Sequence, residues 1–248
     1  MPRLSERLHA VARLVGEGLV MADVGTDHAY VPIYLCQQKR IPRAIAMDIR
    51  MGPLERAWEH ILQYGLQAYI ETRLSDGVAE LRPGEVDSIV IAGMGGGLTI
   101  RILSDGQKVC HRAKELILQP QSDVCHVRSY LAENGYAVEA EEMVAEDGKF
   151  YPMMRVHWAG ATAAAAASME GTVDADSALR RDVEMLYGKG LLAARHPVLG
   201  TYLEREERNL NKIKTELAAQ PQVGQVAKRM REVSYRLECN EAARAYYR

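Results

Sequence analysis

Short runs rich in valine and isoleucine alternate with segments of helical character through the first half of the chain. The runs cover residues 19–23, 44–48, 68–74, 86–92 and 116–119. Repeated strand–helix units pair their strands in parallel, because each helix crosses over a face of the sheet. The spacing of Leu4, Leu8, Val11 and Val15 adds an amphipathic helix over residues 2–15. We therefore predict a parallel sheet covered by helices.

The pattern changes after the fifth run. A helix is expected around residues 124–133, and residues 136–143 and 149–157 then form two β-rich segments joined by a turn with the letters AEDG. An Asp-Gly pair between two such segments is typical of a tight antiparallel hairpin. By analogy, five parallel strands ending in a hairpin are typical of the seven-stranded sheet of Rossmann-like class I methyltransferases and not of dehydrogenases. The predicted fold class is α/β with such a sheet.

A small helical domain is expected to follow. Residues 159–177 are rich in alanine, threonine and serine and indicate a linker. Beyond them, apolar residues recur at helical or heptad spacing in three stripes: Leu179, Val183 and Leu186; Leu199, Leu203, Leu210, Ile213 and Leu217, with Glu206 as the polar exception; and Val223, Val226, Met230, Val233 and Leu237. Such stripes predict a coiled-coil hairpin or three-helix arm. The expected domains are residues 1–160 and 178–248; packing within a monomer is favoured, and dimerisation stays open.

Charge is divided unevenly between these parts. After Ser177 the chain has 14 Lys and Arg against 9 Asp and Glu, a balance of +5, and the rest has 17 against 24, a balance of −7. A basic arm on an acidic body favours a polyanionic partner, although a modest excess can also be a solvated face. Lys228, Arg229 and Arg236 lie mostly off the apolar stripe, so their charges are expected to face solvent. Lys228 and Arg229 are therefore candidate substrate contacts.

Composition also limits where the protein acts and what it binds. No apolar run is long enough to span a membrane, and the N-terminus lacks the apolar segment of a signal peptide, so we expect a cytoplasmic protein with no membrane association. The four cysteines include no CxxC pair, which favours free thiols. Cys110-His111 and Cys125-His126 repeat a dipeptide, but adjacent residues seldom converge on one ion, and we expect no metal.

The loop after the first run reads DVGTDHAY, residues 23–30. Gly25 allows a sharp turn before a helix, so that backbone N–H groups face a ligand, and we assign Asp23 and Gly25 to a cofactor site. Asp27 and His28 stand where a dinucleotide-binding loop would place its second glycine and its neighbour. Asp27 would repel a pyrophosphate but could bind the ammonium of a methionine-like group. The alternative is that Asp27 only caps the helix.

Two acidic positions follow the next runs. Asp48 ends the second run about twenty residues after the glycine turn, where an acid commonly accepts hydrogen bonds from ribose hydroxyls. Asp76-Gly77 follows the third run, where a carboxylate could accept a hydrogen bond from the exocyclic amine of adenine. A plain turn is the alternative for that pair. Both positions are assigned to the cofactor site.

The fourth run leads into the letters AGMGGG, residues 92–97. Glycines at the carboxyl edge of an open sheet let a flat base approach the backbone. Gly93 and Met94 are expected on the cofactor side of this loop and Gly95 and Gly96 on the substrate side. Polar or aromatic side chains that could reach the same edge are His28, Tyr30, Gln119 and Tyr151.

Six segments occur in unbroken order over residues 4–156: DVGTDHAYVPIYL, AMDIRMGPLERA, RLSDGV, IVIAGMGGGLTIRIL, LILQPQ with VRSYLAENGY, and EDGKFYPMMRV. Together they resemble the bacterial tRNA (adenine-22, N1)-methyltransferase family, for which DHAY and AGMGG are specific elements. The helical part is similar to the family's coiled-coil domain in length and pattern. The alanine-rich linker departs from the family and leaves the placement of the two domains open.

The resemblance implies S-adenosylmethionine as methyl donor and transfer to N1 of adenine 22 in tRNA. Adenine N1 has an in-plane lone pair, so it can attack without first losing a proton, and alignment could supply most of the rate. This fits AGMGG in place of the Asn/Asp-Pro-Pro-aromatic loop of exocyclic-amine methyltransferases. The base must be unstacked, because N1 lies on its Watson–Crick edge. Asp27, His28 and Tyr30 are the candidates for base positioning or donor contact.

Three other functions stay open at this point. An NAD-dependent oxidoreductase is permitted by Asp48 and disfavoured by Asp27 and His28. A catalytically silent RNA-binding module would use the cofactor pocket only structurally. A methyltransferase acting on another RNA or on a small molecule is the third, and in the small-molecule case the basic helices would have no evident purpose.

Overall fold

The computed structural model describes residues 2–160, 175–221 and 223–248. The chain forms two compact units, Met1–Glu170 and Gly171–Arg248, called here the sheet unit and the helical unit. Most of the predicted linker lies outside the described residues. Its last part was predicted wrongly, because the helix α8 begins at Ala175.

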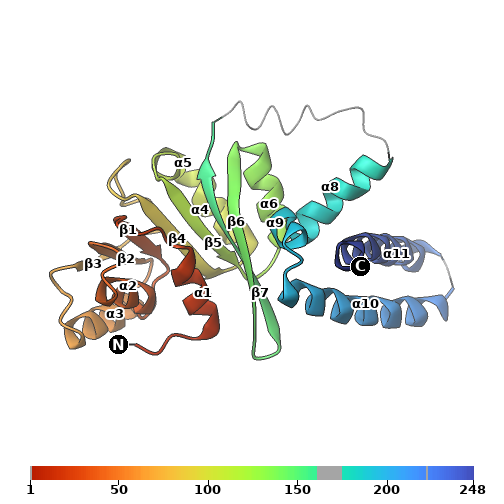
Figure 1. Cartoon of the computed structure of the whole chain (residues 1–248), viewed down its shortest axis with the longest axis horizontal. Coiled ribbons are helices and arrows are strands. Elements are labelled where there is room, and N and C mark those ends of the chain that lie inside the picture. Colours follow the sequence, from red (N-terminus) through yellow and green to blue (C-terminus); the bar gives the residue numbers. More distant parts are fainter. Residues whose placement is uncertain (1, 161–174, 222) are drawn as a thin grey trace. The chain divides into compact units, whose positions relative to one another are not determined.

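The sheet unit has the predicted strands. They are β1 (Met21–Val24), β2 (Ala44–Asp48), β3 (Ile70–Leu74), β4 (Ser88–Met94), β5 (Glu115–Pro120), β6 (Tyr136–Glu146) and β7 (Lys149–Trp158). They form one seven-stranded sheet in the order β3-β2-β1-β4-β5-β7-β6 (Figure 1). The first five strands are parallel, and β7 is antiparallel to both β5 and β6. The predicted fold class is therefore confirmed.

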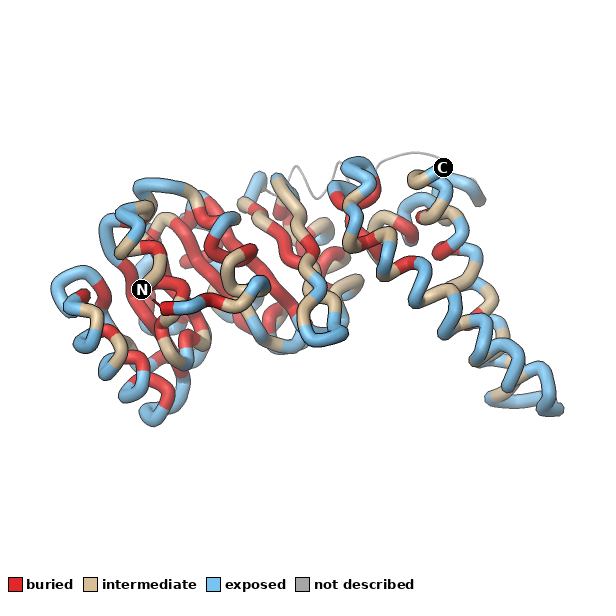
Figure 2. The backbone as a smooth tube through the Cα atoms, turned by 60° about the horizontal axis from the view of Figure 1, so that its bottom comes forward, coloured by how far each residue is buried: buried red, intermediate tan, exposed pale blue. Residues whose placement is uncertain are grey.

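Helices cover both faces of this sheet. They are α1 (Glu6–Leu14), α2 (Tyr30–Gln37), α3 (Met51–Gln63), α4 (Gly96–Asp105), α5 (Gln107–Cys110) and α6 (Val124–Glu133). One apolar cluster joins α1, α2 and α3 to side chains such as Met21 and Ile117, and the other joins α4, α5 and α6 to side chains such as Ile89 and Leu118. Figure 2 shows that the central strands are buried almost throughout. Both faces are apolar because helices cover both.

Helix α1 begins later than predicted. The expected start was residue 2, but Ser5 is the N-cap, and its hydroxyl accepts a hydrogen bond from the backbone N–H of Leu8 at 3.3 Å. Such a bond satisfies one of the N–H groups that the first helical turn leaves free. The amphipathic character is confirmed, because Val11 and Val15 are buried.

The β6–β7 hairpin closes one edge of the sheet. Asp147 and Gly148 have φ values of 50° and 71°, which a two-residue hairpin turn of the primed type requires. At the far end of β7, the Trp158 indole stacks on the His111 imidazole with 4.2 Å between ring centroids and an interplanar angle of 6°. Burial lowers the pKa of His111. The Asp147-Gly148 turn thus fixes one end of the hairpin, and the ring stack of Trp158 on His111 fixes the other.

The helical unit comprises α8 (Ala175–Tyr187), α9 (Lys189–Ala193), α10 (Pro197–Ala218), α11 (Gly224–Arg244) and the short 3₁₀ helix η1 (Ala245–Tyr247). Helix α11 packs against both α10 and α8 within the chain. Leu199, Leu203 and Val233 of the predicted stripes are buried. Val223 is 70% exposed and lies at the N-cap of α11, so its assignment to a packed stripe was wrong.

Glu206, the polar exception of the α10 stripe, accepts hydrogen bonds from four side chains. Its donors are Tyr187 at 2.6 Å, Tyr202 at 3.1 Å, Arg236 at 2.8 Å and Asn240 at 3.0 Å. These residues come from α8, α10 and α11, so one carboxylate joins three helices. The expectation that the Arg236 charge faces solvent was wrong, because this carboxylate holds the guanidinium, whose side chain is 32% exposed.

None of the helices in the described part of the chain is long and apolar enough to cross a membrane.

Candidate functional site

The carboxyl ends of β1 and β4 mark the point where the strand order reverses. In open α/β sheets this position forms the ligand-binding crevice. Gly25 follows β1 with φ 74°, and a Cβ atom added there would lie 2.2 Å from the terminal methyl of Met94 at the end of β4. The two predicted cofactor residues are therefore in direct contact. A side chain at position 25 would displace Met94, and the positive φ would strain it in addition.

Two buried carboxylates lie at the carboxyl ends of the adjacent strands β1 and β2. Asp23 accepts a hydrogen bond from the Thr26 hydroxyl at 2.6 Å, and Asp48 accepts one from the backbone N–H of Arg50 at 2.9 Å. Burial raises the pKa of Asp23 to about 6; the Thr26 hydrogen bond opposes this rise, and the Asp48 charge adds to it. Asp48 has spare acceptor capacity, as a residue that binds ribose hydroxyls would need.

Asp27 is held by α3 and not by the helix that follows it. Its carboxylate accepts a hydrogen bond from Arg56 at 2.6 Å and lies 3.3 Å from the imidazole Nε2 of His28. Helix α2 begins after Ala29 without a side-chain cap, so the capping alternative for Asp27 was wrong. Binding of a ligand ammonium by Asp27 stays a prediction, and the ligand would share the carboxylate with Arg56.

His28 and Tyr30 belong to a cluster of three rings. Their rings stack with 5.1 Å between centroids, and the His60 ring from α3 lies 5.1 Å from Tyr30 and 5.3 Å from His28. The Nδ1 of His60 lies 3.1 Å from the carbonyl oxygen of His28, so Nδ1 carries the donated proton. The ring contacts and the hydrogen bond of His60 together attach the DHAY loop to helix α3. The rings of His28 and Tyr30 are thus in contact, and the Asp27 carboxylate lies beside His28, so the three predicted catalytic residues are close together.

Asp76-Gly77 lies in the loop between β3 and β4. Asp76 is 55% exposed at its side chain and pairs with Arg101 of α4 at 2.9 Å. Gly77 has φ 59°, and a Cβ there would lie 3.0 Å from the Ile102 side chain. Both the turn and a contact with adenine are compatible with this geometry, so the cofactor role stays a prediction.

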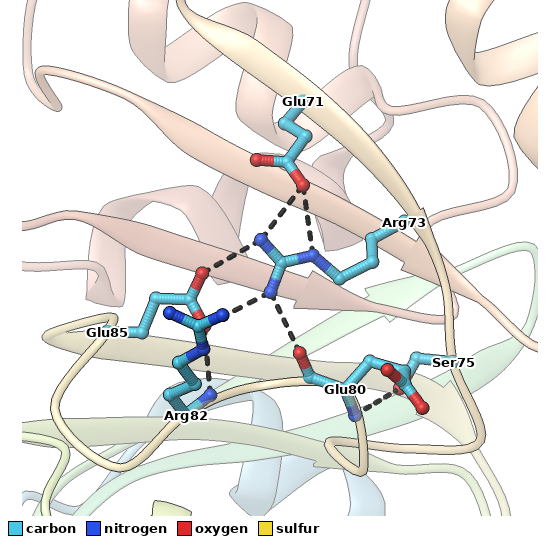
Figure 3. Close-up of polar contacts among 6 residues, drawn as sticks. All are labelled: Glu71, Arg73, Ser75, Glu80, Arg82 and Glu85. Atoms are coloured by element: carbon cyan, nitrogen blue, oxygen red, sulfur yellow. Dashed lines mark hydrogen bonds and ion pairs between the residues drawn. The ribbon is translucent and has the colours of Figure 1, made fainter.

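A network of charges fixes this loop (Figure 3). Arg73 on β3 donates to the Glu85 carboxylate at 2.8 Å and 3.1 Å and to the backbone carbonyl of Glu80 at 2.9 Å. The Arg73 hydrogen bond lowers the pKa of Glu85 to about 2, against the effect of desolvation. Ser75 accepts the backbone N–H of Glu80 at 3.2 Å. Ser75 also donates a hydrogen bond to the backbone carbonyl of Gly77 at 3.0 Å, so the network includes the Asp76-Gly77 turn.

The glycine loop after β4 is pinned by a buried amide. Gly93 has φ 81° at a register shift of β4, and its N–H donates to Gln119 Oε1 at 3.2 Å. Arg7 of α1 donates to the same oxygen at 3.0 Å, and its guanidinium lies 5.6 Å from the centroid of the Tyr151 ring. Gln119 thus contacts the loop and is fully buried, whereas Tyr151 lies beside Arg7; a substrate contact by either residue stays a prediction.

Gly95 and Gly96 differ in what they could tolerate. A Cβ at Gly96 would lie 2.5 Å from the carbonyl oxygen of Ser122, so glycine is required there for packing. Gly95 has ordinary extended dihedrals, and its Cβ would lie 3.3 Å from the Ser122 hydroxyl. Gly95 is exposed and Gly96 is buried. Of these two glycines, only the exposed Gly95 can therefore present its backbone to a substrate.

Lys228 and Arg229 belong to the helical unit. Both are exposed, and Arg229 pairs with Glu232 at 3.0 Å. Among the described residues no three His, Cys, Asp or Glu side chains are grouped so that they could hold a metal ion.

The polar groups of the sheet unit fit a nucleoside linked to an amino acid. Asp48 offers a hydroxyl acceptor, Asp23 offers a buried carboxylate, and Gly25 adds no side chain of its own to the turn. The sequence patterns did not identify Arg7, Arg56 and His60, which hold the predicted residues in place. Arg56 and His60 are four residues apart and so share one helical face, but no motif connects them to the DHAY loop.

The chain is similar to known proteins in both sequence and structure. The family model described as "Methyltransferase domain" matches residues 4–154. A tRNA (adenine(22)-N(1))-methyltransferase of Bacillus subtilis is 40% identical over 152 residues. That match includes 61% of this chain and 64% of the relative's length.

Solved structures align with nearly the whole chain. The B. subtilis m1A22 tRNA methyltransferase TrmK is 32% identical with a TM-score of 0.81, covering 97% of this chain and 98% of that one. M. capricolum TrmK, solved in complex with S-adenosyl-homocysteine, is 26% identical with a TM-score of 0.77, covering 99% of both chains. The likeness therefore includes the helical unit as well as the sheet unit.

Proposed function

Because the chain belongs to the methyltransferase family, and within it to the bacterial tRNA (adenine(22)-N(1))-methyltransferases, we propose that it methylates N1 of adenine 22 in tRNA with S-adenosylmethionine as donor. The observation that carries this proposal is the juxtaposition of buried Asp23 and Asp48 with the open glycine loop at Gly95. Carboxylates for the donor and a bare backbone for a flat base then lie at the same edge of the sheet. The proposed cellular location is the cytoplasm, where tRNA is found.

Donor binding is proposed to use the ends of β1, β2 and β3. Asp48 would accept the ribose hydroxyls, and Asp23 would face the ammonium of the amino acid. An ammonium beside Asp23 favours its ionised form and so opposes the effect of burial on its pKa. When bound, the donor supplies a methyl group activated on a sulfonium. Asp76 would accept a hydrogen bond from the exocyclic amine of adenine while it stays paired with Arg101.

Acceptor binding is proposed to use the DHAY loop and the glycine loop. His28 and Tyr30 offer stacked rings to an unstacked base, and Gly95 lets the base edge come close to the backbone. N1 attacks with its own lone pair, so these residues need only align the base and exclude water. The clamp on Asp27 by Arg56 supports this role, because a fixed loop aligns a base better than a mobile one.

The helical unit is proposed to bind the body of the tRNA. Lys228 and Arg229 are exposed on α11 and available for phosphate contacts. Packing of α11 against α8 and α10 within the chain supports a monomer, because the apolar stripes already have partners. The domain roles are residues 1–160 for catalysis and residues 178–248 for tRNA binding.

The test is a methyl-transfer assay with full-length protein, isotope-labelled S-adenosylmethionine and unmodified tRNA. We expect one methyl group per tRNA, located by nuclease digestion and mass spectrometry at N1 of adenine 22, and none on a tRNA with guanine at position 22. Labelling of a small molecule or of another nucleotide would overturn the proposed substrate. Binding of S-adenosylhomocysteine without any methyl transfer would indicate a catalytically silent RNA-binding module, and binding of NADH instead would indicate an oxidoreductase.

A further inference from the structure

Arg7 differs from the other half-buried or buried arginines of the sheet unit. Each of the others is paired with a carboxylate: Arg40 with Glu17 at 3.6 Å, Arg73 with Glu85 at 2.8 Å, Arg128 with Glu141 at 2.8 Å and Arg155 with Glu139 at 3.1 Å. Within the described residues Arg7 has no carboxylate partner; its one hydrogen bond goes to the neutral amide of Gln119. A partly desolvated guanidinium without a counter-ion is unfavourable unless a ligand supplies one.

The position of Arg7 indicates where that ligand group would lie. Its Nη1 would be 3.6 Å from a Cβ placed on Gly93, so the guanidinium borders the glycine loop. Gln119 fixes one edge of the guanidinium at 3.0 Å, and the Tyr151 ring supports the group with 5.6 Å between Cζ and the centroid. Attraction between a cation and an aromatic face is stronger where water is partly excluded, so the Tyr151 ring further stabilises the position of the Arg7 guanidinium. In the part of the chain that the structure describes, no protein acceptor binds the N–H donors of the other edge.

We propose that Arg7 binds an oxyanion carried by one of the two reactants at the glycine loop. A planar guanidinium with two free parallel N–H groups matches a carboxylate or a phosphate bidentately. The two sources of such an anion are the carboxylate of the methyl donor and a phosphate next to the target adenine. The assignment rests on the proposed function and adds a residue from α1 to a site otherwise built from the ends of the strands.

The test uses full-length protein and Arg7→Gln, which retains a donor for Gln119 but removes the charge. Arg13→Gln is the matched control, because Arg13 is exposed in the last turn of the same helix. Calorimetry would compare S-adenosylhomocysteine with 5′-methylthioadenosine, which has the same thioether nucleoside but lacks both the carboxylate and the ammonium of the amino acid. Steady-state kinetics would give KM for unmodified tRNA as a function of salt, and thermal unfolding would check the fold of each variant.

Two results support the proposal and identify the source. A loss of tenfold or more in affinity for S-adenosylhomocysteine, with unchanged affinity for 5′-methylthioadenosine, assigns Arg7 to the donor carboxylate. An unchanged donor affinity with raised KM for tRNA, and a log–log salt dependence flatter by about 0.7 to 0.9, assigns it to one phosphate. The Arg13→Gln protein should match wild type in every measurement.

Other results overturn it. Equal weakening of both nucleosides, a fall in kcat alone, or behaviour identical to Arg13→Gln would reduce Arg7 to a support for Gln119. Failure of the proposed function is distinguishable, because wild-type protein would then fail to methylate N1 of adenine 22 in tRNA, whatever the Arg7 variant does.

Discussion

The two units of this chain are stabilised by different kinds of interior. The sheet unit has two large apolar clusters, one on each face of the sheet, and its site carboxylates lie at the rim. The helical unit buries few large apolar side chains and places the Glu206 network among them. A sheet covered on both faces can leave its strand ends polar for chemistry. Long helices with a narrow apolar contact need another means to fix their register.

This difference predicts where polar substitutions are costly. In the helical unit the polar Glu206 is part of the packing, so its loss should lower the free energy of unfolding. In the sheet unit the polar residues of the site cost stability or contribute little to it, so their loss should affect ligands more than folding.

The largest expected effect is on Glu206. Glu206→Ala would leave the Arg236 guanidinium and the Tyr187 hydroxyl without their acceptor, and we expect a loss of about 2–4 kcal/mol, less than for a fully buried pair because Arg236 is partly exposed. Chemical denaturation followed by far-ultraviolet circular dichroism would measure it. Glu216→Ala, at an exposed position of the same helix, should stay within about 0.5 kcal/mol. Equal effects of the two variants would remove the proposed role of the network.

Substitution of Asp23 should change the stability in the opposite direction to substitution of Glu206. Its folded pKa of about 6 exceeds the unfolded value of 3.8, so the folded state binds the proton more tightly and stability falls as pH rises from about 4 to 6. Asp23→Asn should therefore stabilise the protein by roughly 1–3 kcal/mol at pH 7 and remove this pH dependence.

Asp87→Asn is the matched contrast for Asp23→Asn. The backbone N–H of Val20 lowers the pKa of Asp87, so its carboxylate contributes stability at neutral pH that is lost as the pH falls. We expect this variant to be less stable than wild type at pH 7. Denaturation curves at pH 4, 6 and 8 would show the two signs, and a destabilised Asp23→Asn protein at pH 7 would contradict the sign expected for Asp23.

Asp48→Ala should change ligand binding and leave the fold intact. Loss of the acceptor for the ribose hydroxyls is expected to cost about 1–3 kcal/mol of donor affinity, or roughly fivefold to 150-fold. Titration calorimetry with S-adenosylhomocysteine would measure it, with exposed Asp105→Ala as control. Unchanged affinity in a folded Asp48→Ala protein would exclude this carboxylate from the donor site.

The smallest effect on stability is expected for the exposed charges of α11. Lys228→Gln with Arg229→Gln should change the free energy of unfolding by less than about 0.5 kcal/mol. Affinity for tRNA should nevertheless fall, and its log–log dependence on salt should flatten by about 0.7 to 0.9 for each phosphate that the variant no longer neutralises. The pair Lys212→Gln and Lys214→Gln on α10 tests whether position matters. Indistinguishable effects of the two pairs would indicate a general charge effect.

Sequence patterns predicted the sheet because each strand carries its own signal. A run such as residues 44–47 is apolar on both faces, and the Asp147-Gly148 pair selects its turn locally. The site was predicted only as far as strand ends determine it. Asp23, Gly25 and Asp48 converge because the topology brings their strands together.

The residues that hold the site were not predictable in the same way. Arg56 lies 29 positions after Asp27 and Arg7 lies 112 positions before Gln119, and both pairs form through tertiary packing. Glu206 interrupts an apolar stripe in the sequence, but the stripe does not show which side chains the carboxylate binds. A polar residue at such a position requires partners, and those partners were on helices whose register the stripe alone does not fix.

The ring stack at the end of β7 provides a built-in optical signal. The chain has two tryptophans, Trp58 and Trp158, and both belong to the sheet unit. Intrinsic tryptophan fluorescence therefore reports on that unit alone, whereas helical ellipticity reports on both. Trp158 stacks on His111, and a protonated imidazole quenches indole emission, so the quantum yield should fall as His111 becomes protonated below its lowered pKa. The two units can thus be followed separately in a single sample without any added label.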